Sequence, residues 1–410
     1  MTRHSGARNA AIVAAFAAFA LVLGGCAGAT PATSPTPSGS PSAALLPFDG
    51  DTLTATVEDA ATEMRVPGVV AYVRTPDGEF VAEHGVTEFG GTTPVSVDDR
   101  IRIGSNTKTW TGTVILQLAQ EGVLSLDDPV SDYRPEVPNG ENITIAQLLT
   151  MRSGLANFTA TLEHNEAMDA DPQRVWQPEE LLAIAFALPP AFAPGEGFLY
   201  SNTNTVLLGL IAEQLDGKPL EEIFQERLFE PLDLTSTLFP PLTSHAIPEP
   251  YSRGYQFGTN VESMDGALSP ELQQQAADGE LAPIDHTDDN PSWGWAAGAG
   301  ISTLTDLVTW VEALTEGGLL DDEYQALRME SLTRQSDDPQ SALYGLAIAQ
   351  FGPLYGHTGE LPGYNSFMGH DPETGVTVVV WANLAPLPDG RAPAIEIAKT
   401  LIGQIYPPAG

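Results

Sequence analysis

The sequence predicts an α/β fold in which strands from both chain ends form one antiparallel sheet around a helical insertion. Alternating and β-branched runs of strand length occur near both ends of the chain. Between them, apolar residues recur at helical spacing. Strands so far apart in sequence can share a sheet only if the middle of the chain is an insertion. We expect one unit of two lobes: an α/β lobe at about residues 51–104 and 295–410, and a helical lobe at about residues 105–294.

The first elements of the body are a helix and a hairpin. Residues 53–65 place apolar side chains at helical spacing. The segments VVAYVRT and GEFVAEHGV follow within residues 69–86 and flank a Pro-Asp-Gly turn. This pattern predicts two paired strands.

The later elements follow from the same two periodicities. Helices are predicted at residues 108–122, 144–154, 204–217 and 303–318, each of which ends at a glycine, a common helix stop. Strands are predicted at residues 344–351, 355–359, 364–371 and 376–384, the last two joined by Pro-Glu-Thr-Gly. A final helix is predicted at residues 392–406.

Composition limits the kinds of partner and of site. The chain has 410 residues, of which 42% are hydrophobic, and this is enough to bury a large core. Its 54 acidic residues outnumber its 17 Lys and Arg residues, so the net charge of −37 repels a phosphate backbone and excludes nucleic acid as a partner. A single cysteine excludes a disulfide framework and a Cys-rich zinc module.

The N-terminal segment has the layout of an export signal followed by a spacer. Residues 1–25 contain two arginines, an apolar run and then small residues. LGGC, which ends at Cys26, resembles the lipobox of a bacterial lipoprotein signal. The resemblance implies that Cys26 is lipidated and that the exported protein is anchored on the outer face of the cell membrane; a plain secretory signal or a retained membrane helix are the alternatives. Residues 26–50, rich in Pro, Ser and Thr, are expected to form an extended linker.

Ser105 and Lys108 stand three positions apart at the start of a predicted helix, in IGSNTKTW. This spacing places both side chains on one helix face. A serine hydroxyl needs a base within hydrogen-bond reach to act as a nucleophile, and a lysine serves if burial lowers its pKa. Taken alone, the pair also fits an N-capping serine followed by a surface lysine.

Tyr200 and Asn202 form a second motif, in GEGFLYSNTN, before another predicted helix. A tyrosine beside an ammonium group can relay a proton, and an Asn carboxamide can hold a lysine and donate to a substrate carbonyl. An aromatic core residue followed by a helix cap is the alternative.

His357, Thr358 and Gly359 lie on a predicted strand in YGHTGELPGY, directly before Glu360. Gly359 is expected to permit close approach of a substrate to the backbone, and the amide N–H of Glu360 to point into the site. An ordinary strand with a satisfied histidine is the alternative.

The three motifs, Ser-x-x-Lys, Tyr-Ser-Asn and His-Thr-Gly, occur in this order, separated by about 90 and about 155 residues. In this combination the chain resembles the serine penicillin-recognising hydrolases. Within them it resembles the branch of the D-alanyl-D-alanine carboxypeptidases, class C β-lactamases, esterases and D-aminopeptidases. The resemblance covers roughly residues 51–405 and implies that residues 51–410 form one catalytic domain of β-lactamase/transpeptidase-like fold. It implies a serine hydrolase acting on an amide, ester or lactam in a small molecule or a cell-wall peptide.

The resemblance also implies a role for each motif residue. Ser105 attacks the scissile carbonyl and becomes acylated, while Lys108 and Tyr200 share the proton transfers. Asn202 positions both Lys108 and the substrate, and His357 supplies a weak, pH-sensitive positive field. Backbone N–H groups of the serine and of the residue after His-Thr-Gly form an oxyanion hole, and no metal or cofactor is required. The other expected substrate-binding residues are Thr358, Gly359, Glu360 and, as an aromatic wall, Trp293.

One part of the pattern departs from the carboxypeptidases. In those relatives an Arg on the preceding strand and a Thr after His-Thr-Gly grip the substrate carboxylate, whereas Ala349 and Glu360 stand there in this chain. An acidic residue repels an anion, which argues against action on a free D-Ala terminus. We hypothesise that Glu360, if it faces the pocket, selects neutral or amine-bearing acyl substrates; if it points to solvent, it contributes only its backbone. A penicillin-binding or receptor lipoprotein without significant turnover is the alternative function.

Overall fold

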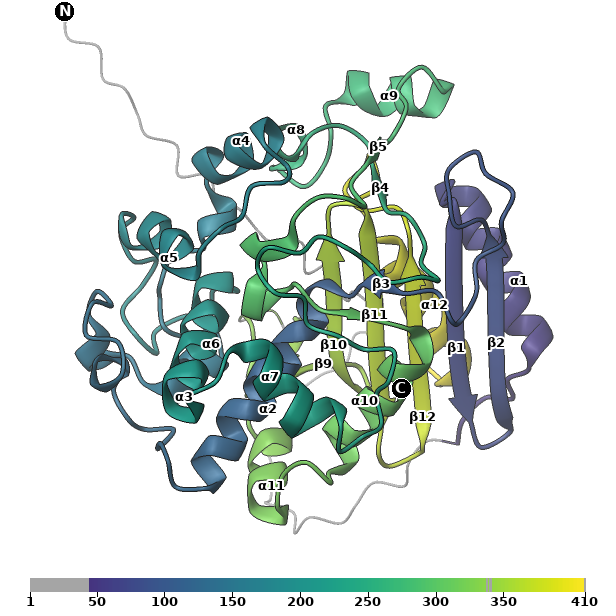
Figure 1. The fold of residues 1–410 in the computed structure, drawn as a ribbon. Helices are drawn as coiled ribbons and strands as arrows, with labels where there is room; N and C mark the ends of the chain where they lie inside the picture. The colour runs from purple at the N-terminus through teal and green to yellow at the C-terminus, as the bar shows by residue number, and fades with distance from the viewer. Residues whose placement is uncertain (1–43, 337, 339–340, 409–410) are drawn as a thin grey trace, which may run out of the picture.

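The structure, a computed structural model, describes residues 44–336, 338 and 341–408. Eight strands form one antiparallel sheet in the order β2-β1-β12-β11-β10-β9-β8-β7 (Figure 1). N-terminal strands thus lie beside C-terminal strands, which confirms the predicted fold class. The strands are β1 (Gly68–Thr75), β2 (Gly78–Gly85), β7 (Thr333–Arg334), β8 (Leu343–Tyr344), β9 (Ala349–Phe351), β10 (Leu354–Leu361), β11 (Tyr364–Asp371) and β12 (Val376–Ala382).

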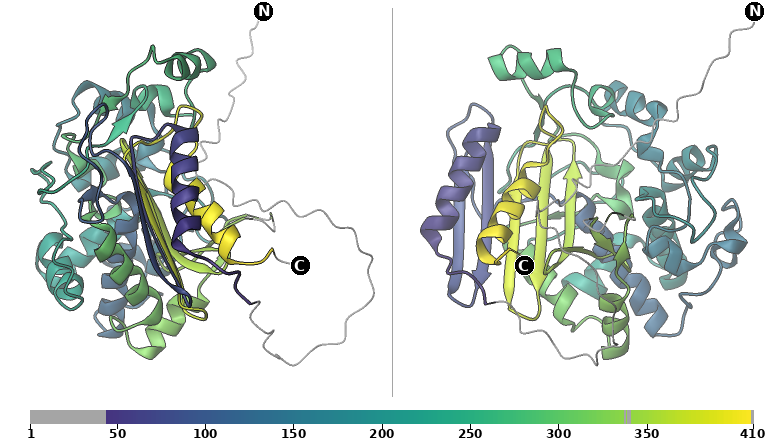
Figure 2. Two further views of the ribbon diagram at one scale, coloured as in Figure 1. Left: turned by 90° about the vertical axis from the view of Figure 1, so that its right-hand side faces the viewer. Right: turned by 180° about the vertical axis from the view of Figure 1, so that it is seen from behind.

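Helices cover both faces of this sheet (Figure 2). Helices α1 (Gly50–Met64) and α12 (Pro393–Ile405) pack against each other on one face. Helix α10 (Leu304–Glu316) packs on β11 and β12 from the other face. Because both faces are covered, every residue of β11 and β12 is buried.

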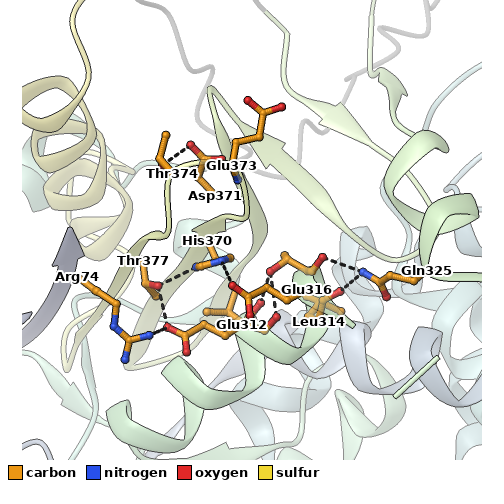
Figure 3. A network of polar contacts seen from close by, with 12 residues as sticks. Arg74, Glu312, Leu314, Glu316, Gln325, His370, Asp371, Glu373, Thr374 and Thr377 are labelled. Atoms are coloured by element: carbon orange, nitrogen blue, oxygen red, sulfur yellow. Dashed lines mark hydrogen bonds and ion pairs between the residues drawn. The ribbon is translucent and has the colours of Figure 1, made fainter. Parts of the chain in front are cut away.

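A polar network fixes α10 to the sheet (Figure 3). His370 of β11 lies 2.8 Å from Thr377 Oγ1 of β12 through Nδ1, and 3.0 Å from Glu316 Oε1 of α10 through Nε2. Thr377 donates to Glu312 Oε1 at 2.9 Å, and Glu312 also pairs with Arg74 of β1. These contacts join α10 to three neighbouring strands.

The middle of the chain is mostly helical, as predicted, but the helix expected at residues 144–154 ends at Leu149, and strands β4 (Tyr255–Gln256) and β5 (Ile284–Asp285) pair within the region expected to be helical. Helix α2 (Thr107–Gln120) is buried on all sides up to Ala119 and packs against α6 (Asn202–Asp216). Helix α6 ends at Gly217, whose φ of 76° is the left-handed conformation that favours glycine. The other helices are α3 (Ile145–Leu149), α4 (Leu162–Ala170), α5 (Pro178–Phe186), α7 (Leu220–Phe224), α8 (Asn260–Ser263), α9 (Pro270–Asp278) and α11 (Asp322–Glu330).

The predicted strand at residues 344–351 is interrupted. Strand β8 ends at Tyr344, β9 begins at Ala349, and Ala347 between them has a φ of 54°. The Ala347 amide donates to the carbonyl of Leu149 at 3.1 Å. A long-range contact with the helical region, which periodicity cannot show, therefore accompanies the break.

Of the N-terminal segment, only the last residues of the predicted linker can be compared with the structure. The export signal at residues 1–25, Cys26 and most of the predicted linker at residues 26–50 lie outside the described residues. Of the linker, residues 44–50 are described: Phe48 is buried in the core rather than extended in solvent, and Gly50 is the first residue of α1. Within the part of the chain that the structure describes, no helix is long and apolar enough to cross a bilayer.

Candidate active site

Ser105 lies in a single turn, η1 (Gly104–Asn106), that leads directly into α2. Gly104 has a φ of +56°, and a Cβ built on it would lie 2.5 Å from the backbone nitrogen of Glu360. Only glycine fits this turn so closely against β10. The turn leaves Ser105 half-buried at the start of a buried helix, where its hydroxyl lines a cavity.

Lys108 lies one turn further along, and its amine is within reach of the serine. Lys108 Nζ is 2.9 Å from Ser105 Oγ, donates to the carbonyl of Ala297 at 2.7 Å and lies 4.9 Å from the centre of the Tyr200 ring. The lysine is fully buried, and desolvation lowers the pKa of its amine well below the usual value. A neutral amine can make both hydrogen bonds: one N–H donates to Ser105 Oγ, the other donates to the Ala297 carbonyl, and the lone pair can still take up a proton.

Tyr200 lies in the loop before α6, close to the same two groups. Burial raises the pKa of its phenol above the usual value, while a hydrogen bond from Ser105 acts in the opposite direction and lowers that pKa. The phenol is therefore protonated at neutral pH, and it can give a proton at the serine or receive one there.

Asn202 is the first residue of α6, and its contacts differ from those expected. Its Nδ2 donates to Thr159 Oγ1 at 3.1 Å, and its backbone nitrogen donates to Asn157 Oδ1 at 3.1 Å. Within the described residues, the hydrogen bonds of Lys108 go to Ser105 and to the Ala297 carbonyl. The expectation that Asn202 holds Lys108 is therefore wrong for this structure, although Asn202 does line the cavity.

His357 on β10 is a buried neutral residue. Its Nδ1 lies 2.6 Å from the carbonyl of Thr358 and its Nε2 lies 3.2 Å from the hydroxyl of Tyr344. Burial, together with the nearby Lys108 amine, lowers the pKa of His357 to about 3. The predicted pH-sensitive positive field is therefore wrong: the ring is uncharged at neutral pH and packs beside Tyr200 instead, with ring centres 6.1 Å apart.

Gly359 was expected to let a substrate approach the backbone closely, but in the structure it lets two backbone segments of the protein approach each other. A Cβ built on Gly359 would lie 1.9 Å from the carbonyl oxygen of Ile103 and 2.5 Å from Ser366 Oγ. The glycine thus lets β10 lie directly against the segment that carries Ser105. The neighbouring Thr358 lines the cavity.

Glu360 follows Gly359 and also lines the cavity. Its Oε2 lies 3.4 Å from Asn365 Nδ2, and no Lys or Arg among the described residues forms an ion pair with it. Solvent reaches this side chain from the cavity, but desolvation by the surrounding protein still raises the pKa of its carboxyl to about 7. Its backbone nitrogen lies next to the turn of Ser105, as a two-amide oxyanion hole requires.

The cavity in front of Ser105 has a volume of about 260 Å³. Six of the predicted site residues line it: Ser105, Tyr200, Asn202, Trp293, Thr358 and Glu360. Lys108 and His357 lie behind this surface and are fully buried. Trp295, two residues after Trp293, is also buried and packs in the core.

Sequence reasoning missed several groups around this cavity. The Ala297 carbonyl, which holds Lys108, leaves no signal in a side-chain pattern. Tyr344 contacts His357 from a separate strand, and Thr159 contacts Asn202 from a short 3-10 helix at residues 158–160. His164 belongs to none of the three motifs, yet it lines the cavity.

Comparisons with known proteins agree with this geometry. The family model described as Beta-lactamase matches residues 53–402. A D-stereospecific amidohydrolase from a Streptomyces species is similar in structure, with a TM-score of 0.73, 29% identity and coverage of 88% of this chain and 100% of that one. The D-amino acid amidase from Ochrobactrum anthropi SV3, complexed with D-phenylalanine, has a TM-score of 0.72, 26% identity and coverage of 86% and 98%.

A longer relative is similar in sequence. Protein flp from Staphylococcus aureus (strain COL) is 28% identical over 316 residues, which are 73% of this chain but only 56% of the flp protein. The chain thus matches a little over half the length of that relative. The family match and the amidohydrolase neighbours together support a serine hydrolase that acts on amides or lactams. The chain belongs to the Beta-lactamase family.

Proposed function

We propose that this protein is an amidase that hydrolyses amides of amino acids with a free amino group, through an acyl-enzyme on Ser105. The observation that carries the proposal is the carboxyl of Glu360, which lines the cavity without a cationic partner among the described residues. Such a carboxylate attracts an ammonium group and repels a second carboxylate. The similar structures named for D-stereospecific amidohydrolase and D-amino acid amidase activity support an amide substrate.

Acylation begins with a proton transfer from Ser105 Oγ to the neutral amine of Lys108, 2.9 Å away, as the oxygen bonds to the amide carbon. The negative charge on the amide oxygen is stabilised by the N–H groups of Ser105 and Glu360. The proton then passes through Lys108 and Tyr200 to the leaving nitrogen, and the carbon–nitrogen bond breaks. In the second half of the reaction, water gives a proton to Lys108 and Tyr200 and attacks the ester carbon. The same pair returns a proton to Ser105 Oγ as the ester bond breaks, and the acid is released.

Two rival functions fit the site less well. A carboxypeptidase or an efficient β-lactamase must hold a substrate carboxylate, which Glu360 repels above pH 7. A receptor without turnover has no use for a fully buried lysine 2.9 Å from a serine hydroxyl, because burying an amine is costly.

The test compares D-phenylalanine amide with N-acetyl-D-phenylalanine amide. We expect kcat/KM for the free amine to exceed that for the acetylated compound by about tenfold or more. Glu360 is ionised above its pKa of about 7, and an α-amino group is protonated below about 8, so the preference should be largest between these values. Glu360→Gln should remove the preference, whereas the exposed control Glu58→Gln should keep it. Equal preference in the wild type and Glu360→Gln would contradict the proposal.

We also propose that the protein is exported and anchored by lipid on Cys26. The support is the LGGC segment after an apolar run, and a charge-free spacer after it. Cys26→Ala expressed from the full chain should shift the protein from the membrane fraction to the soluble exported fraction or leave it as uncleaved precursor. Unchanged membrane attachment of a correctly cleaved Cys26→Ala protein would argue against the anchor.

A further inference from the structure

His164 is an unexplained polar group in the wall of the cavity. It lies in the first turn of α4, where its backbone nitrogen donates to Thr161 Oγ1 at 3.2 Å. Its side chain is fully buried and lines the same cavity as Ser105. Neither ring nitrogen has a hydrogen-bond partner among the described residues.

Three aromatic side chains surround this imidazole. The ring centres of Phe158, Trp176 and Trp293 lie 5.3, 5.1 and 5.9 Å from that of His164. Of the three, only Trp293 also lines the cavity, and its indole is half-buried. Trp293 and His164 are thus neighbours in the cavity wall, and a ligand ring that contacts Trp293 there lies beside the imidazole.

The imidazole is neutral and keeps one donor and one acceptor. Burial, and to a smaller degree the charge of Arg174, lower the pKa of His164 to about 4. A phenylalanine would fill the same aromatic surroundings without this cost, whereas a buried polar group without a hydrogen bond destabilises the empty site. The free energy lost in the empty site is recovered if a ligand supplies the missing hydrogen bond.

We infer that His164 and Trp293 form the subsite for the acyl side chain, and that this subsite prefers an aromatic ring with a hydrogen-bonding group at its tip, such as a phenol. The inference rests on the proposed amidase function, since it names the side chain of that substrate. A phenol hydroxyl suits either tautomer of the imidazole, because it can donate to the bare nitrogen or accept from the N–H. Trp293 supplies the aromatic surface.

The test uses D-tyrosine amide and D-phenylalanine amide, which differ only in the phenol hydroxyl. We expect the wild type to favour D-tyrosine amide in kcat/KM by about tenfold. His164→Phe should bring the ratio to about one or below, and His164→Asn, which keeps a donor and an acceptor near the position of Nδ1, should retain part of the preference. His84→Phe, on strand β2, is the control and should keep the wild-type ratio.

Binding of the same two amides to Ser105→Ala, measured by calorimetry, separates this inference from the proposed function. A binding preference for D-tyrosine amide that His164→Phe removes, without turnover by the wild type, would overturn the amidase and keep the subsite. Turnover of both amides at equal kcat/KM, with equal binding, would overturn the subsite and keep the amidase. The absence of both binding and turnover would overturn both.

Discussion

At the scale of single residues, the chemistry depends on the protonation state of Lys108. Its amine is fully buried, and its contacts with Ser105 and the Ala297 carbonyl are those of a neutral base. No carboxylate among the described residues pairs with it, so desolvation alone lowers its pKa. Because no such carboxylate stabilises the charged form of the lysine, its amine is available as a base at neutral pH.

This arrangement predicts the pH dependence of acylation. The lowered pKa of Lys108 means that the reactive neutral form increases as pH rises through that value, so kcat/KM should rise from acid to neutral pH. Lys108→Arg should lose at least about a thousandfold in kcat/KM at every pH, because a guanidinium stays protonated. A stopped-flow pH profile checks both. Substantial activity of Lys108→Arg would show that another group takes the proton.

His357 shows why a motif is not sufficient to assign a charge. The pattern His-Thr-Gly predicts an imidazole at the site, but burial, and next to it Lys108, lower the pKa of that imidazole, and neither effect can be read from the motif. Burial beside the lysine makes the ring neutral. The side chain thus supports Tyr200 by packing rather than by charge.

At the scale of elements, the site depends on the contact between β10 and the turn that carries Ser105. Gly359 is the position where the two backbones come closest, with the Ile103 carbonyl 1.9 Å from where a Cβ would stand. Separating the two segments would move the N–H of Glu360 away from the serine, and with it one side of the oxyanion hole.

Gly359→Ala should therefore lower both stability and activity. We expect a loss of about 3 kcal/mol in the free energy of unfolding, because a backbone oxygen must move to admit the methyl group. Gly403→Ala is the matched control: it is exposed in α12 with nothing within 4 Å of the new Cβ, and should stabilise the protein by about 1 kcal/mol. Denaturant titration of both variants checks this, and an unchanged midpoint for Gly359→Ala would refute the close approach.

The elements themselves were predictable where periodicity is local. The β1–β2 hairpin and strands β11 and β12 follow from alternating or β-branched runs, and α2 and α6 follow from apolar spacing. The strand at residues 344–351 was not predictable, because its break coincides with a hydrogen bond from Ala347 to Leu149. That bond joins segments far apart in the chain, and no local pattern encodes it.

At the scale of the whole molecule, the sheet order explains how the site is assembled. Strands from both chain ends lie side by side, and the helical middle brings Ser105, Tyr200 and Asn202 to the edge of β10. The order of the three motifs made this convergence predictable through the family resemblance. Which atoms meet was not predictable: the Ala297 carbonyl rather than Asn202 holds Lys108, because that contact depends on how the 3-10 helix at residues 295–297 packs against α2.

The net charge of the chain also affects which substrates the protein attracts. With 54 acidic and 17 basic residues, the molecule attracts cations from a distance and repels anions. This long-range field has the same sign as the local effect of Glu360. Both favour an amine-bearing substrate over one that carries a free carboxylate.

The most direct measurement of the central claim is the mass of the protein, intact and after digestion, following brief mixing with a neutral p-nitrophenyl ester. The account predicts an added mass equal to the acyl group on the wild type, carried by the peptide that contains Ser105, and no such mass on Ser105→Ala. An adduct that forms equally on Ser105→Ala, or ester turnover that survives this substitution, would contradict a serine that Lys108 activates.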